Sequence, residues 1–345
     1  MTNKTAWLTA QETLEVKDSP LPAVAAGDVL IRIRHTGICG SDIHIYQNPY
    51  QAKKMKLPAV LGHECAGEVV SFGKDVSGFE KGDLVALEPG VPCGHCRFCR
   101  EGRYNLCPEV VFMGATPFLY GAFSQYVAHP ARMVFKLPSG MNTLQGSLLE
   151  PFSVGLHAVA RANARPGNSA LILGCGCIGL MVLLALRALG VERIAVADLF
   201  GIRLEQAKEL GAWETVNSHE QDLRDTAGEL TKGAGFDFVF ETAGSRATAS
   251  MTTDLVARGG KIVMVGNTFG ETPIKLFALN QKEADILSVF RYRNLYPSAI
   301  ELVASGKAPV EKIVSDIYPL GRIQEAFTRA QHAKESAVKL VIDTE

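Results

Sequence analysis

The sequence predicts an α/β protein with two domains: a doubly wound parallel sheet, and a mostly β domain that carries a metal-binding lobe. Three observations support this prediction. Residues 169–198 follow the order strand, glycine turn, helix, strand and acid. The chain changes near residue 151 from β-type segments to alternating strands and helices, and four cysteines crowd into residues 93–107. The 345 residues, 47% of them hydrophobic, suffice for two ordinary domains.

Composition and charge narrow the function classes. The formal net charge is −1 and the chain has no basic block, so we expect neither a nucleic acid nor a membrane as partner. The N-terminus, MTNKTAWLTAQETLEVK, has no apolar signal core, which favours a cytoplasmic protein. The chain has eight cysteines, and four of them lie close together in sequence. Because there is no secretory signal, this crowding indicates metal binding rather than a disulfide framework.

The first domain is expected over residues 1–150, where strands lie between glycines and prolines. Its predicted strands are Val29–Ile33, Ala66–Ser71, Asp83–Leu87 and Phe123–Ala128. We expect the tail, residues 293–345, to return to this domain, which makes the domain discontinuous. The tail has helices near Pro297–Ala304 and Ile323–Ala330 and a last strand, Val338–Ile342.

The second domain is expected over residues 151–292, where apolar runs of strand length alternate with helical segments. The predicted strands are Ala170–Leu173, Arg193–Ala197, Phe236–Glu241, Lys261–Gly266 and a closing strand near Ile286–Phe290. Helices are predicted from the glycine turn to Leu189, over Ile202–Leu210 and over Thr248–Arg258.

The glycine turn of this domain fits a dinucleotide. Gly174 allows the tight turn, Gly176 lets a pyrophosphate approach the backbone, and Gly179 lets the helix pack close to the strand. Free N–H groups at the helix start then bind the anion. Asp198 follows about 20 residues later, where its carboxylate can bind the ribose hydroxyls and repel a 2′-phosphate. The sequence therefore favours NAD over NADP.

Two other interpretations of this stretch remain. A lone glycine motif can be an ordinary loop, although here the flanking strands and the acid are both present. Residues Ser169–Leu186 also carry no charge, which would suit a short membrane span. The three glycines in the first half and the strand–acid unit that follows argue against the span.

The four cysteines have metal-ligand spacing. Cys93, Cys96, Cys99 and Cys107 follow the pattern C-x2-C-x2-C-x7-C in a turn-rich lobe, residues 88–110. Four thiolates leave no open coordination position, so we predict a closed tetrahedral zinc site of structural type. The alternative is an iron–sulfur cluster, but its usual final gap is about three residues rather than seven.

A second metal site is less visible from spacing. The candidates are Cys39, His63, Glu64 and Glu150: one thiolate, one imidazole and one or two carboxylates could hold zinc with a position left open for water or substrate. The residues alone leave the question open, because a single buried histidine or cysteine is more often part of a core.

The chain resembles the zinc-dependent medium-chain dehydrogenases along nearly its whole length. The motifs that carry the resemblance occur in the family's order: GICGSDIH, GHECAGEVV, the cysteine quartet, LLEPFSVGLHA, GCGCIG and VFRY. EPFSVG and Phe290-Arg291-Tyr292 look most like the polyol branch, the sorbitol (L-iditol) and xylitol dehydrogenases. Threonine and butanediol dehydrogenases share most of the other motifs. The implied fold is a Rossmann domain plus a GroES-like catalytic domain.

The resemblance implies oxidation of a secondary alcohol, most of all a sugar alcohol, with hydride transfer to NAD. It also implies two zinc ions per chain, one catalytic and one structural, and a homotetramer or homodimer. Cys39, His63 and Glu64 match the catalytic zinc ligands, and Glu150 matches a carboxylate that binds the zinc or its water. Ser41 and His44 match a proton relay that runs through the nicotinamide ribose.

The remaining site residues also come from the resemblance. Expected coenzyme contacts are Gly174, Gly176, Ile178, Gly179, Asp198, Arg203, Val265, Gly266, Asn267, Val289, Phe290 and Arg291. Expected substrate contacts are Tyr46, Glu150, Arg291 and Tyr292.

Two departures from the polyol branch make the substrate pocket look more apolar. Ile45 stands where that branch often has an aromatic residue, and Phe118-Leu119-Tyr120 replaces a polar stretch. The chemistry could therefore act on butanediol or L-threonine instead. A third interpretation, an NAD-binding zinc protein without catalysis, would need none of Cys39, Ser41 or His63.

Overall fold

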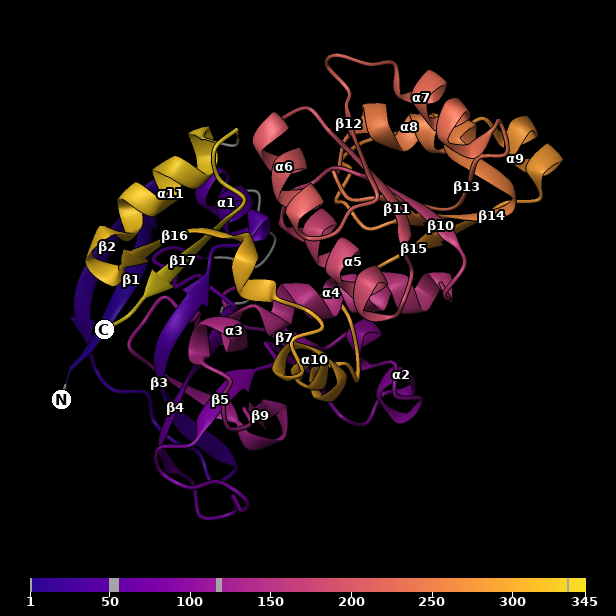
Figure 1. The fold of residues 1–345 in the computed structure, drawn as a ribbon. Helices are drawn as coiled ribbons and strands as arrows, with labels where there is room; N and C mark the ends of the chain where they lie inside the picture. The colour runs from indigo at the N-terminus through magenta and orange to yellow at the C-terminus, as the bar shows by residue number, and fades with distance from the viewer. Residues whose placement is uncertain (1, 50–55, 116–119, 334) are drawn as a thin grey trace. The chain divides into compact units, whose positions relative to one another are not determined.

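The computed structural model describes residues 2–49, 56–115, 120–333 and 335–345 (Figure 1). The chain divides into two compact units. Unit 1 comprises Met1–Glu150, Tyr296–Ala304 and Val310–Glu345, and unit 2 comprises Pro151–Leu295 and Ser305–Pro309. The chain thus returns to unit 1 at Tyr296 rather than at residue 293, and the loop after the first returning helix belongs to unit 2.

Unit 2 is built on a six-stranded, all-parallel sheet. In sheet order its strands are β12 (Glu214–Asn217), β11 (Arg193–Asp198), β10 (Ser169–Leu173), β13 (Phe236–Glu241), β14 (Val256–Met264) and β15 (Asp285–Ser288). Its helices are α4 (Leu149–Ala162), α5 (Cys177–Ala188), α6 (Gly201–Glu209), α7 (Leu223–Thr231), α8 (Arg246–Leu255) and α9 (Leu276–Lys282). Figure 1 shows α5 and α6 on one face of the sheet and α7 to α9 on the other. The predicted doubly wound α/β class is confirmed.

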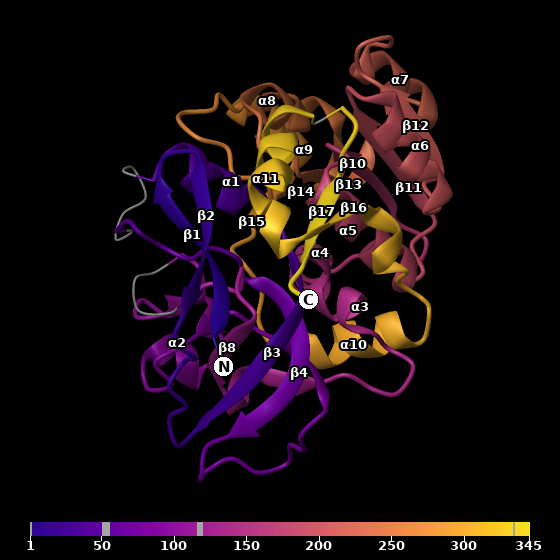
Figure 2. The ribbon, with the colours of Figure 1, turned by 90° about the vertical axis from the view of Figure 1, so that its left-hand side faces the viewer.

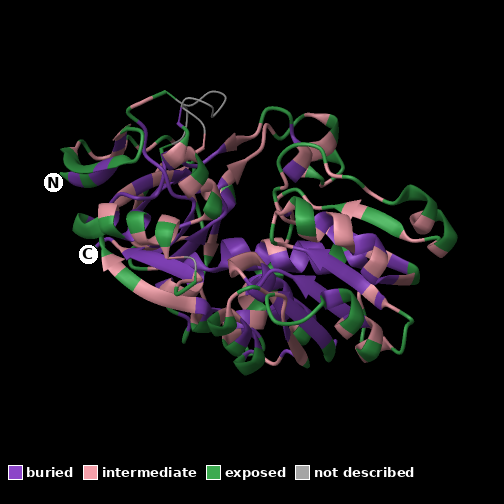
Figure 3. Ribbon diagram, turned by 90° about the horizontal axis from the view of Figure 1, so that it is seen from above, coloured by how far each residue is buried: buried purple, intermediate pink, exposed green. Residues whose placement is uncertain are grey.

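The strands of this sheet are apolar because both faces are covered. All five residues of β10, SALIL, are buried, as are the four central residues of β11. Figure 3 shows the central strands as buried ribbon. The strand order reverses between β10 and β13, which makes the carboxyl ends of these two strands the place where a dinucleotide binds in such folds.

Unit 1 is mostly β, as predicted. Its sheet runs β16 (Val314–Pro319), β17 (Lys339–Asp343), β3 (Asp28–Gly37), β4 (Glu64–Phe72), β5 (Leu84–Leu87) and β9 (Val134–Lys136), and β8 (Tyr126–Pro130) also pairs with β3. A hairpin of β1 (Asn3–Ala10) and β2 (Thr13–Ser19) packs beside α11 (Ile323–His332), as Figure 2 shows. The returning tail is held here because β17 pairs with β3.

Several predicted elements needed correction. The region expected to be β with turns also contains α1 (Gly40–Gln47) and α3 (Thr143–Ser147), and α4 begins at Leu149, before the expected boundary. The strand expected at Phe123–Ala128 begins at Tyr126, since Phe123 instead hydrogen-bonds to the backbone of Leu61 and Ala6. The helix expected to reach Arg258 ends at Leu255.

Among the described residues, no helix is both long and apolar enough to cross a membrane. A short membrane span was the alternative interpretation of the uncharged stretch at 169–186. In the structure this stretch divides into β10, the glycine turn and the first part of α5. The remaining short elements of unit 1 are β6 (Gly90–Val91), β7 (Val111–Phe112), α2 (Arg97–Arg100), α10 (Tyr296–Ala304) and 3₁₀ turns at Tyr104–Leu106, Ala131–Met133, Val310–Ile313 and Leu320–Arg322.

Candidate active site

Three of the expected catalytic ligands lie together in unit 1. Ligand atoms of Cys39, His63 and Glu64 are within 4.8 Å of one another, and we name these residues the mixed cluster. Cys39 precedes α1, and His63 and Glu64 stand at the start of β4. His63 and Glu64 are buried and Cys39 is partly buried. Because β3 pairs with β4, with Gly37 opposite Glu64, the sheet brings the two segments together.

Asp42 holds the mixed cluster in place. One carboxylate oxygen accepts a hydrogen bond from the backbone N–H of Cys39 (3.0 Å), which closes the first turn of α1 as a capping box. The other accepts from the N–H of Gly62 (3.2 Å) and lies 3.5 Å from Nδ1 of His63. Because the Asp42 carboxylate lies beside Nδ1, the other ring nitrogen, Nε2, is the one available to a metal. A carboxylate in this position also fixes the orientation of the histidine ring.

The electrostatic surroundings of His63 favour a cation. Burial alone would lower its pKa, but the carboxylate of Asp42 and the thiol of Cys39 outweigh burial and raise the pKa well above its ordinary value. The same neighbouring groups that stabilise a proton on this ring stabilise a bound metal ion in its place.

A buried lysine faces the cluster from the far end of the chain. Nζ of Lys339 in β17 forms an ion pair with Oε2 of Glu64, and both side chains are 1% exposed. Nζ also donates a hydrogen bond to the carbonyl of Ile38 (3.0 Å). The pair needs a glycine beside it, because a Cβ on Gly37 would lie 2.8 Å from Cε of Lys339 and closer still to the carboxylate. Sequence analysis missed Lys339, although a lysine that opens the apolar run KLVID was a signal.

Glu150 stands outside this group. It is buried in the first turn of α4, and its carboxylate is not among the ligand atoms that lie within 4.8 Å of one another. Its charge acts on two neighbours. Burial raises the pKa of Cys65, and Glu150 adds to that rise; burial likewise raises the pKa of Glu88 to about 7, with Glu150 contributing. Glu150 therefore lies near the mixed cluster without joining it.

The two relay residues lie on one face of α1. Ser41 and His44 are three residues apart, which places them on adjacent turns of the same side of a helix. Ser41 is partly buried and His44 is exposed. Of the two, His44 is therefore the side chain that meets solvent.

Tyr46, expected to contact substrate, lies in the core of unit 1. Its side chain is 1% exposed, and its ring packs against Phe327, with ring centroids 5.0 Å apart. Its hydroxyl donates to the carbonyl of Glu12 (2.9 Å) and accepts from the amide of Gln324 (2.7 Å). Tyr46 belongs to the core beneath α11, because residues two positions apart on a helix point in different directions: His44 is exposed and Tyr46 is buried.

The structure describes only part of the second departure from the polyol branch, residues 118–120. Phe118 and Leu119 lie outside the described residues. Tyr120 is exposed and packs edge-on against Trp7 (5.8 Å between ring centroids), where both line a cavity of about 410 Å³. None of the predicted metal ligands lines that cavity.

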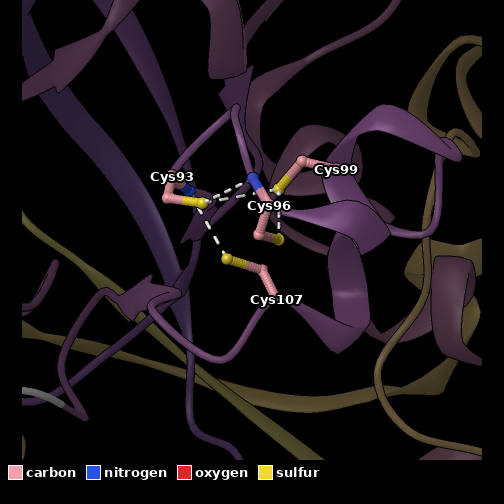
Figure 4. Close-up of side chains that lie close together, drawn as sticks. All are labelled: Cys93, Cys96, Cys99 and Cys107. Carbon is pink, nitrogen blue, oxygen red and sulfur yellow. Dashed lines mark hydrogen bonds between the residues drawn. The ribbon is translucent and has the colours of Figure 1, made fainter.

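The cysteine quartet forms a second cluster in unit 1 (Figure 4). Ligand atoms of Cys93, Cys96, Cys99 and Cys107 lie within 4.8 Å of one another, and no disulfide joins them. The Cys96 and Cys99 sulfurs are 3.4 Å apart, and those of Cys93 and Cys99 are 3.9 Å apart. A hydrogen bond from the backbone of His95 is the main cause that lowers the pKa of Cys93 to about 6, which favours its thiolate. Four sulfurs at this spacing fit a tetrahedral zinc ion.

The glycine turn of unit 2 has the geometry of an anion site. Gly174 has φ +101°, and a Cβ on Gly179 would lie 1.8 Å from the carbonyl oxygen of Gly174. A Cβ on Gly176, in contrast, would meet only a guanidinium nitrogen of Arg203 at 3.9 Å, so the space above the turn is open. Gly176 is the N-cap of α5, whose first N–H groups, including that of Ile178, lack helical partners. The turn therefore fits a pyrophosphate.

Asp198 follows the glycine turn in sequence and also hydrogen-bonds to it. Its carboxylate accepts hydrogen bonds from the backbone N–H groups of Cys175 (2.6 Å), Leu199 (2.8 Å) and Phe200 (3.0 Å). Arg203 stacks on the Phe200 ring (5.1 Å) and approaches the Asp198 carboxylate at 3.9 Å. The acid at the end of β11 thus connects the pyrophosphate turn to the segment where a ribose would lie.

The other expected coenzyme and substrate residues follow β14 and β15. The N–H groups of Val265 and Gly266 donate to the carbonyl of Glu241 (both 2.9 Å), and Asn267 is exposed. β15 ends at Ser288, so Val289 and Phe290 follow the strand instead of closing it. Arg291 has a left-handed backbone (φ +53°) and stacks on the Phe290 ring, and Tyr292 is buried.

Comparison with known proteins gives a consistent result. Residues 25–139 match the family model described as "alcohol dehydrogenase GroES-like domain", and residues 177–305 match "zinc-binding dehydrogenase". The chain is 43% identical over 344 residues to an uncharacterized zinc-type alcohol dehydrogenase-like protein, YdjJ, of Escherichia coli K12, covering 99% of both chains. It is 42% identical over 334 residues to a sorbitol dehydrogenase of Bacillus subtilis, covering 95% of this chain and 94% of that protein.

A solved structure agrees with these relatives. The crystal structure of an Escherichia coli oxidoreductase/dehydrogenase of unknown specificity, involved in membrane biogenesis, superimposes with a TM-score of 0.97 at 42% identity. The match covers 100% of both chains.

Proposed function

This chain belongs to the zinc-dependent medium-chain alcohol dehydrogenase family and is an NAD-dependent alcohol or polyol dehydrogenase, and within that class we propose that its substrate is a sugar alcohol, which it oxidises to the ketose. The observation that carries the proposal is the mixed cluster, whose sulfur, nitrogen and oxygen ligands lie within 4.8 Å of one another. Such a donor set leaves zinc an open position, which a binding protein without catalysis would not need.

We assign the cluster residues as follows. Zinc held by Cys39, His63 and Glu64 would act as a Lewis acid that lowers the pKa of an alcohol oxygen. The Ser41 hydroxyl accepts the alcohol proton while it gives up its own, and His44, exposed on the same face of α1, releases a proton to solvent. Lys339 balances the charge of Glu64, and Asp42 fixes the orientation of His63. Glu150, outside the group, acts on substrate or on a water rather than as a further direct ligand.

The coenzyme residues belong to unit 2. The open turn at Gly176 binds the pyrophosphate of NAD, and Asp198 and Arg203 face the adenosine ribose. NAD supplies the hydride acceptor. The carboxylate of Asp198 repels a 2′-phosphate, so we propose that NAD is strongly preferred over NADP. Equal catalytic efficiency of the protein with both coenzymes would overturn this assignment.

The sugar-alcohol substrate rests on Arg291 and Tyr292 and on the likeness to a sorbitol dehydrogenase. A guanidinium and a phenol offer several hydrogen-bond donors, as a substrate with adjacent hydroxyls requires. The alternative, a diol such as butanediol or an amino alcohol such as L-threonine, is favoured by the apolar character of Ile45 and of residues 118–120.

The test is a substrate panel followed by NADH absorbance. We expect higher kcat/KM with sorbitol, xylitol or galactitol than with butanediol or L-threonine. Arg291→Leu should raise KM for the polyol far more than it raises the Kd of NAD, because the coenzyme is held mainly by the glycine turn. Parallel loss of activity toward a simple secondary alcohol would show that Arg291 is structural and would weaken the polyol assignment.

We also propose that the protein forms a homo-oligomer through the free side of its parallel sheet. β15 is the last strand of the sheet order, and Ile286 on it is exposed. The preceding segment exposes Phe269 (70%), Leu276 (66%) and Phe277 (74%). An edge strand next to apolar side chains favours pairing with a second copy. Sedimentation should show a dimer or tetramer that Phe277→Glu dissociates; a monomeric wild type would contradict the proposal.

A further inference from the structure

Glu241 is a buried acid at the carboxyl end of β13 that the alcohol chemistry does not use. The residue is 0% exposed. Its Oε1 accepts hydrogen bonds from the N–H of Gly244 (3.0 Å) and from the hydroxyl of Thr248 (2.7 Å). Its Oε2 is equally buried and has no hydrogen-bond partner, and in the described ranges no lysine, arginine or histidine pairs with this carboxylate.

Such a group needs an explanation. Burial raises the pKa of Glu241, while the hydrogen bonds from Thr248 and from the backbone of 243–245 offset part of that rise. A buried carboxylate without a counter-charge lowers stability, so proteins rarely keep one unless a ligand compensates it or a function requires it.

The unpartnered oxygen lies directly behind an expected coenzyme segment. The carbonyl of Glu241 accepts from the N–H groups of Val265 and Gly266, both at 2.9 Å. A Cβ on Gly266 would lie 2.7 Å from Oε2 and 2.3 Å from the nitrogen of Gly244. The Glu241 carboxylate therefore packs directly against the turn that follows β14, and the close approach is possible because residue 266 is a glycine.

The topology assigns this turn to one half of the dinucleotide. The pyrophosphate turn follows β10 and the ribose acid follows β11, so the adenosine half lies over β10 and β11. The two halves of such a fold each bind one mononucleotide across the switch point. The nicotinamide half thus belongs to β13 and β14, the strands whose ends carry Glu241 and Gly266.

We propose that Glu241 selects the oxidation state of the coenzyme: its uncompensated negative charge favours the cationic nicotinamide of NAD over the neutral ring of NADH. A fixed charge has a different interaction energy with the two forms, and only such a difference can shift the ratio of their affinities. Release of NADH after turnover is promoted by the same preference. The inference concerns the coenzyme and does not depend on which alcohol is oxidised.

The test is the variant Glu241→Gln, which keeps the size and the acceptor oxygen but removes the charge. The Kd values of NAD and of NADH are measured by calorimetry and by NADH fluorescence on the zinc-loaded protein. We expect the ratio of Kd for NAD to Kd for NADH to rise roughly tenfold, the effect of one unit charge about 12 Å away at an effective dielectric of about 20. The Kd of ADP-ribose, which has no nicotinamide, should not change.

Two control variants separate charge from shape. Thr248→Val removes the hydroxyl donor and keeps the charge of Glu241. Asp237→Asn removes another carboxylate of β13, at the opposite end, where Asp237 accepts from the N–H of Ser169 (2.7 Å). Both should leave the ratio unchanged.

Three results would overturn the proposal: an unchanged ratio in Glu241→Gln, an equal weakening of NAD, NADH and ADP-ribose, or a change in Thr248→Val as large as in Glu241→Gln. If Glu241→Gln melts too low for binding to be measured, Glu241→Met, similar in length and also uncharged, takes its place.

Discussion

The mixed cluster and the cysteine quartet are two metal-type sites in one unit, built in opposite ways. The quartet draws its ligands from 15 consecutive residues, 93–107, and from one kind of atom. The mixed cluster draws three kinds of atom from two segments that the pairing of β3 with β4 brings together, and it needs a lysine from β17. The quartet can thus order its own lobe, whereas the mixed cluster presupposes a folded sheet.

The largest expected effect breaks the mixed cluster alone. Cys39→Ser should lower kcat more than a hundredfold, because it removes a zinc ligand, and should leave one zinc per chain and normal NAD binding. Zinc analysis, calorimetry and an NADH assay measure these three quantities. A variant that keeps its turnover would show that the two sites are assigned the wrong way round.

The second prediction breaks the quartet alone. Cys99→Ser should lose the other zinc and lower the melting temperature by several degrees, because metal binding and folding of this lobe are coupled. Molecules that remain folded should keep NADH production. The measurements are a melting curve and the activity per folded molecule. Full stability of this variant would mean that the lobe orders without its metal.

The third prediction removes the long-range support of the mixed cluster. In the zinc-free protein, Lys339→Met should destabilise unit 1 by about 3 kcal/mol, because it leaves Glu64 charged, buried and unpaired. Adding Glu64→Gln should recover most of the loss. The matched control is Lys136→Met, which breaks a pair between the exposed Lys136 and the partly buried Asp83 at the surface and should cost less than about 1 kcal/mol. Equal urea midpoints for the two single variants would contradict the role of Lys339.

The fourth prediction, with the smallest expected effect, concerns Asp42, which supports the mixed cluster without being one of its ligands. Asp42→Asn should weaken zinc binding at the mixed cluster by roughly 10–100-fold, because the carboxylate that orients His63 loses its charge. The quartet should keep its zinc. Glu109→Gln, an exposed acid 3.9 Å from His95 beside the quartet, is the control and should change neither site. Competition with a chelator measures the zinc affinity of both clusters. An equal loss of affinity at the mixed cluster and at the quartet would point to unfolding.

The same contrast explains what the sequence could predict. Cys93 to Cys107 were recognisable because local spacing alone determines that their sulfurs meet. The glycine turn and Asp198 were equally accessible, since strand, turn and helix follow one another directly. Cys39, His63 and Glu64 depended on a family resemblance, because no local rule says that β3 pairs with β4.

What sequence analysis missed or misplaced has a common physical cause. Helix α1 begins with Gly40-Ser41, poor helix formers, and forms because Asp42 caps it. Tyr46 was assigned to substrate because it is near His44 in sequence, but the turn of α1 directs it into the core. Glu241 and Lys339 are charged residues in apolar strands, and only the folded structure shows which groups surround them.

The position of Lys339 has a consequence for the order of synthesis. The first 150 residues, which contain every ligand of both clusters, leave the ribosome before unit 2 and long before β17. Until that last strand is made and inserts beside β3, the acid of Glu64 has no buried counter-charge. The quartet can take up its metal early on the nascent chain, but the reactive centre matures only when translation has passed through the coenzyme unit.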